Sequence, residues 1–180
     1  MTMTLVSTIT VGAGGAASIE FTGIPQTGQD LLIVVSARSS ASSSQGNVQV
    51  NTKFNGVGGT SYSDRMLFSQ SGTVSSSSSA SAAQWVWPQV NAGNTTASTF
   101  GSMSIYIANY TSASPKSGSV DIVTENNSAT QTMGISAGSF TGSAITSMSM
   151  ADAFGGTLVQ YSTASLYTIS TTGATGASVA

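Results

Sequence analysis

The chain has 180 residues, only 6% of them charged, and its four basic and six acidic side chains give a net charge of −2. Four scattered cations cannot form the basic stripe that neutralises phosphates, so the composition argues against nucleic-acid binding. Cysteine and histidine are both absent, which excludes disulfides, zinc–thiolate sites and the usual base of a serine nucleophile.

The first residues, Met1 to Leu5, lack the basic region and continuous apolar run of a signal peptide. No segment approaches the ~20 apolar residues that a membrane-spanning helix needs. We therefore expect a chain that is made in a cytoplasm and has no membrane partner. Because 39% of the residues are hydrophobic and they cluster in short blocks, we expect a folded core rather than general disorder.

Short apolar or alternating segments, separated by Gly, Ser, Asn and Pro, predict β-strands along the whole chain. The candidate strands are residues 3–11, 17–22, 30–37, 47–54, 64–69, 83–90, 101–108, 118–124, 131–136, 144–150 and 164–170. The continuous apolar block at 31–35 predicts a central strand covered on both faces. Val48, Val50 and Phe54 alternate with polar residues, which is typical of a strand with one wet face. Serine-rich segments such as Ser75 to Ser81 are predicted to be loose.

These elements predict an all-β protein, an antiparallel β-sandwich of jelly-roll-like form. Good helix formers are scarce, and turns recur without alternating helices. We expect a single domain over residues 1–170, with an N-terminal arm at about residues 1–10. The small, polar residues 171–180 form a predicted C-terminal tail.

Two motifs resemble catalytic or cofactor signatures but lack the partners that such sites require. Residues 134–138 match G-x-S-x-G, yet no histidine is present to take the serine proton. Residues 12–17 fit a relaxed dinucleotide fingerprint, but the following residues predict a strand where a helix N-terminus is needed. The sequence therefore predicts no catalytic residue, no cofactor and no metal site.

Acidic residues and tryptophans leave further alternatives open. A carboxylate pair drawn from Glu20, Asp64, Asp121 and Glu125 could support glycoside hydrolysis, which is the weakest hypothesis. Asp64 and Arg65 are interpreted as making local ion pairs, with Arg65 facing an edge or a subunit contact. Trp85 and Trp87 are predicted on one strand face, as core or as the centre of an interface rather than as a sugar-binding platform.

Several segments resemble, in order, a family of small virion proteins of tailed bacteriophages, of the marine and cyanophage type. The resemblance covers roughly residues 18–170. Its motifs are Phe21-Thr-Gly-Ile-Pro25, Asp30-Leu-Leu-Ile-Val-Val35, Phe54-Asn-Gly56 followed by Tyr62 and Arg65, Ile107-Ala-Asn109-Tyr110, and Ser165-Leu-Tyr167-Thr168-Ile169. The chain departs from the family at Thr168, where glycine is usual.

The resemblance implies a capsid decoration or cement protein on the virion surface, assembled in the host cytoplasm and without enzymatic activity. Its expected partners are the major capsid protein and copies of itself, as a homotrimer. The terminal segments are predicted to be ordered mainly by neighbouring chains. The candidate interface residues are Met3, Leu5, Arg65, Trp85 and Trp87. The alternative is a tail fibre or spike component that recognises a host glycan.

Overall fold

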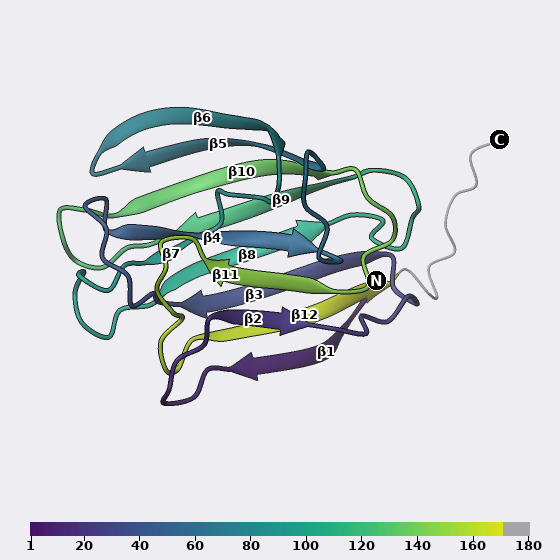
Figure 1. Cartoon of the computed structure of the whole chain (residues 1–180), viewed down its shortest axis with the longest axis horizontal. Helices are drawn as coiled ribbons and strands as arrows, with labels where there is room; N and C mark the ends of the chain where they lie inside the picture. The colour runs from purple at the N-terminus through teal and green to yellow at the C-terminus, as the bar shows by residue number, and fades with distance from the viewer. Residues whose placement is uncertain (171–180) are drawn as a thin grey trace.

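The computed structural model describes residues 1–170, which form two antiparallel β-sheets (Figure 1). The larger sheet contains, in spatial order, β1 (Thr2–Thr10), β12 (Thr163–Ser170), β3 (Asp30–Ala37), β8 (Gly101–Ile107), β9 (Lys116–Val123), β10 (Thr132–Phe140), β5 (Tyr62–Gln70) and β6 (Thr73–Ala82). The smaller sheet contains β2 (Ser18–Phe21), β11 (Met148–Asp152), β4 (Asn47–Phe54) and β7 (Gln89–Asn91). The predicted all-β antiparallel sandwich is confirmed, whereas jelly-roll connectivity stays a prediction.

The hydrophobic core lies between the two sheets and joins both into one cluster. At its centre is a group of aromatic side chains: the rings of Tyr62 and Phe140 stack with centroids 5.0 Å apart. Phe54 meets Trp85 edge to face, also at 5.0 Å between centroids. Large rings in such stacked and edge-to-face contacts bury much apolar area, so this cluster holds β4, β5 and β10 together.

The apolar block at 31–35 forms β3, an interior strand of the larger sheet, but it is covered on one face only. Leu31, Ile33 and Val35 are buried, whereas Val34 is 44% exposed. The prediction that both faces would be covered is wrong, because the smaller sheet packs on one side and nothing in residues 1–170 covers the other. The alternation predicted for β4 is confirmed, since Val48, Val50 and Phe54 are buried.

Two strand predictions near the tryptophans are wrong. The serine-rich segment expected to be loose forms β6, which pairs with β5 at the edge of the larger sheet. Residues 83–88, predicted as part of a strand, form a connecting segment, and the strand that follows it is the short β7. Serine side chains carry no alternation of hydrophobicity, so β6 is specified by its partner strand rather than by its own pattern.

The N-terminal segment, expected to be an arm ordered by a neighbouring chain, is part of the protein's own sheet. Residues of β1 pair with β12 from Thr2 opposite Ser170 to Thr10 opposite Thr163, with a bulge between Leu5 and Ser7. Val6 and Ile9 pack against the core. The expectation of external ordering is therefore wrong for β1, while the predicted tail 171–180 lies outside the described residues.

Candidate functional site

The outer face of the larger sheet, which points away from the smaller sheet, is the candidate functional surface. Successive side chains of a strand point to opposite faces. In β10 the inward residues Thr132, Ser136 and Phe140 are buried, whereas the outward residues Met133 and Ile135 are 63% and 57% exposed. Two of these three inward side chains, Thr132 and Ser136, are small and polar, whereas the large apolar Met133 and Ile135 face solvent.

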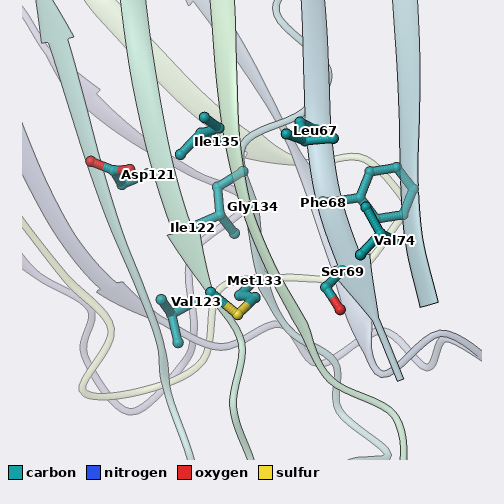
Figure 2. Close-up of a pocket in the computed structure, with 10 residues that line it drawn as sticks. All are labelled: Leu67, Phe68, Ser69, Val74, Asp121, Ile122, Val123, Met133, Gly134 and Ile135. Atoms are coloured by element: carbon teal, nitrogen blue, oxygen red, sulfur yellow. The ribbon is translucent and has the colours of Figure 1, made fainter. Parts of the chain in front are cut away.

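The register of the neighbouring strands places further apolar side chains beside Met133 and Ile135. Met133 stands opposite Val123 of β9 and Ser69 of β5, and Ser69 stands opposite Val74 of β6. Ile135 stands opposite Leu67. The outer apolar patch comprises Leu67, Val74, Val123, Met133 and Ile135, which are between 45% and 72% exposed. They surround a shallow depression of about 340 Å³ (Figure 2).

Charge is almost absent from the outer face. Five charged side chains belong to the eight strands, and Asp30, Asp64 and Lys116 of these are buried. Only Arg65 and Asp121 are exposed. Asp30 serves the fold, since its carboxylate accepts hydrogen bonds from the Tyr106 hydroxyl at 2.7 Å and the Asn109 amide at 2.9 Å. An apolar surface with so little charge is costly to leave in water and suits a protein contact.

Three of the five candidate interface residues lie on this outer face. One cross-strand row runs from Leu5 through Tyr167, Leu32, Tyr106, Ser119 and Ala137 to Arg65. Met3 lies one row further along β1, opposite Ile169. Leu5 thus lies at one end of this row and Arg65 lies near the other, one strand before Ser78 of the edge strand β6. The outer apolar patch lies near Arg65.

The two tryptophans lie elsewhere, and the prediction that they share one strand face is wrong. Trp85 is 1% exposed and belongs to the core, so it cannot serve as a contact residue without unfolding. Trp87 is half-buried and lines a separate groove with Gln49, Gln70 and Gln89. Sequence patterning missed this difference because residues 83–88 are not a strand.

Two of the four basic side chains, Arg38 and Lys116, are buried and organise loops. Lys116 donates hydrogen bonds to the carbonyl oxygens of Ser112, Ser114, Gly142 and Ser143 at 2.6 to 3.0 Å. Arg38 binds the loop 93–99 through carbonyl and hydroxyl oxygens. Burial lowers the pKa of both side chains. Arg38 and Lys116 therefore stabilise loops of the fold. Among residues 1–170, the basic side chains that solvent can reach are those of Lys53 and Arg65.

The carboxylates proposed for the enzyme hypothesis are dispersed. Asp64 is buried on the inner face of β5, while its neighbour Arg65 points outward, so the predicted local ion pair between them is wrong. Asp121 is exposed on β9. Glu125 accepts hydrogen bonds from the amides of Asn126 and Asn127. Within residues 1–170 no group of three or more acidic side chains could hold a metal ion.

Comparison with protein-family models, with curated proteins and with solved structures gives no match to this chain. No helix in residues 1–170 is long and apolar enough to cross a membrane.

Proposed function

We propose that this chain is a structural protein of a tailed-phage virion, a capsid decoration or cement protein that joins neighbouring capsid subunits. The observation that carries the proposal is the outer apolar patch on a nearly uncharged sheet face. The resemblance of residues 18–170 to small virion proteins supports the same role. A surface of this kind is suited to lasting contact with other protein chains.

The mechanism of such a protein rests on contact area and on the number of contacts. Each square ångström of apolar surface removed from water contributes roughly 25 cal/mol. A homotrimer would present three copies of the outer apolar patch around one axis, so that several capsid subunits are held at once. The role needs no catalytic group and no cofactor, and it places the chain on the virion surface.

The test is to remove the outer apolar patch without disturbing the core. Leu67 and Ile135 are more than half exposed, so Leu67→Ser combined with Ile135→Ser should leave thermal unfolding nearly unchanged. We expect the double variant to lose occupancy on virions, measured by quantitative mass spectrometry of purified particles. Phe154→Ser is the matched control, because Phe154 is 49% exposed but lies in the loop after β11. Full occupancy of the double variant would refute the proposal.

The second candidate function is a tail fibre or spike component that binds a host glycan. The number of copies of this protein per particle distinguishes the two functions, because a decoration protein occurs in many copies on each particle, whereas a fibre component occurs in few. One observation favours the second function: Trp87 lines a groove whose other walls are uncharged amide, hydroxyl and aromatic side chains.

A further inference from the structure

A second concave site lies between the smaller sheet and the β5–β6 hairpin. It has a volume of about 260 Å³ and takes residues from β4, β7, β5, β6 and β10. The amide groove, as we name it, is lined by Gln45, Gln49, Phe68, Gln70, Ser77, Trp87, Gln89 and Thr132. It is separate from the outer apolar patch, although Phe68 borders both hollows. The two sites can therefore be altered independently.

The lining of the amide groove is polar but carries no charge. Four of its residues are glutamines, and each amide offers both a donor and an acceptor. A phosphate or carboxylate ligand would need a cation, and none of the lining residues supplies one. Phe68 and Trp87 add aromatic surface beside these amides. This combination matches a ligand that alternates hydroxyl groups with apolar C–H faces, which is the chemistry of a neutral sugar.

The polar groups of the groove include accessible amides and one buried oxygen atom that has no partner within residues 1–170. The side chains of Gln45, which is exposed, and Gln49, which is half-buried, are open to a ligand. Gln89 is 6% exposed, and its Oε1 is buried without a partner. Leaving a buried acceptor such as Oε1 of Gln89 unpaired costs free energy. The terminal torsion of a glutamine is broad, so Oε1 of Gln89 can turn toward a ligand hydroxyl.

The groove also continues beyond Trp87. An adjoining hollow of about 310 Å³ shares Gln45, Phe68 and Gln70 with it and adds Ser44, Ser71, Thr73, Ser75 and Thr130. All of these additional residues carry hydroxyl groups. Together the two hollows form a neutral channel along the inner side of the β5–β6 hairpin. From this lining we propose that the amide groove binds a neutral oligosaccharide, with Trp87 and Gln49 as contact residues.

The two tryptophans provide an internal control for the experiment. The indole N–H of Trp85 donates to the carbonyl oxygen of Ser139 at 2.9 Å inside the core, whereas the side chain of Trp87 lines the amide groove. The full-length protein, labelled with ¹⁵N, is titrated with tetrasaccharides of glucose, galactose, mannose and N-acetylglucosamine. We expect at least one of them to shift the Trp87 indole signal and the side-chain amides of Gln49 and Gln70, while the Trp85 indole signal stays in place.

Two variants then assign the site. Gln49→Ala should weaken binding of that tetrasaccharide at least tenfold, and Asn51→Ala, which changes the next outward residue of β4, should leave the affinity unchanged. The Leu67→Ser and Ile135→Ser variant should also bind normally, so loss of virion attachment and loss of sugar binding remain separate results. Absence of any shift with all four sugars, or equal binding by Gln49→Ala, would overturn the proposal. So would a response only to uronic-acid oligomers.

Discussion

The indole ring of Trp85 lies directly on the backbone of Gly138, so closely that a Cβ atom there would stand 2.4 Å from Cε2 of the ring. Gly138 stands opposite Gly118 in β9, where a Cβ would lie 2.7 Å from Cη2 of the same ring. Because neither glycine has a side chain, the backbones of both residues pack directly against the indole ring of Trp85. Phe54 and the hydrogen bond to Ser139 hold the ring in place from other sides.

Replacing Gly138 with alanine should therefore destabilise the fold by about 1–3 kcal/mol, the usual cost of overpacking a core. The added methyl group would collide with a ring that has no free direction in which to move. Urea unfolding followed by tryptophan fluorescence measures the change. Gly58→Ala is the control, since nothing lies within 4 Å of its added Cβ. Equal stability of the two variants would show that the packing of Trp85 on Gly138 is less tight than these distances imply.

The strand positions could largely be predicted because alternation and turn residues are local properties of the sequence. Residues 30–37 and 47–54 form strands with the predicted bounds. The outer apolar patch could not be predicted, because alternation separates two faces without saying which one is inside. In β10 the inner positions include Gly134 and Gly138. Glycine is needed at these two positions because the side chains of Met66 and Trp85 pack against their backbones. This packing joins residues far apart in the sequence, so the pattern of β10 alone does not reveal it.

The groove lined by Trp87 could not be predicted from the sequence for a related reason. Trp85 and Trp87 are two residues apart, so their spacing suggested one strand face. The connecting segment instead places Trp85 in the core and Trp87 beside glutamines contributed by β4, β5 and β7. Those glutamines are far apart in the sequence, and no local motif links them.

Asp64 gives the folded protein a pH dependence whose sign can be worked out. Burial raises the pKa of this carboxyl from 3.8, and the hydrogen bonds from the Val86 amide, 2.8 Å from Oδ2, and from Trp87 oppose this only in part. Because the folded chain holds the proton more tightly, the contribution of this carboxyl to stability is greatest below pH 3.8. It declines as the pH rises through the folded pKa.

Asp64→Asn should consequently stabilise the protein at neutral pH, by on the order of 1 kcal/mol, because it removes a buried charge and keeps an acceptor for Val86. The advantage should shrink as the pH is lowered toward 3.8, where the wild-type carboxyl becomes protonated. Urea unfolding at several pH values measures both effects. A variant that is less stable than wild type at pH 7, or a difference that is constant with pH, would contradict this account.

Arg38 should be irreplaceable by lysine. Its guanidinium donates to the carbonyl oxygens of Gly93 and Thr95 through one nitrogen, and to oxygens of Thr95, Thr96 and Thr99 through the other. A lysine ammonium cannot span both sets of acceptors. We expect Arg38→Lys to lose about 1–3 kcal/mol of stability and to speed amide hydrogen exchange in residues 93–99. Arg65→Lys, at an exposed position, should change neither quantity, and protection retained in Arg38→Lys would refute the role.

Deleting residues 1–10 should weaken the isolated fold, because β1 belongs to the protein's own sheet. The deletion removes the pairing of β1 with β12 and uncovers core surface under Val6 and Ile9. We expect a loss of roughly 2–4 kcal/mol from two half-buried apolar side chains and their strand, measured by urea unfolding. The new edge strand of the larger sheet would be β12, which has no charged residues, so the shortened protein should also self-associate in sedimentation experiments.

The control for this deletion is Met3→Ser combined with Leu5→Ser. This double variant keeps the backbone pairing of β1 and changes only exposed side chains, so it should unfold like wild type. If the shortened chain were as stable as the full one, β1 would instead be an arm that depends on a neighbouring chain.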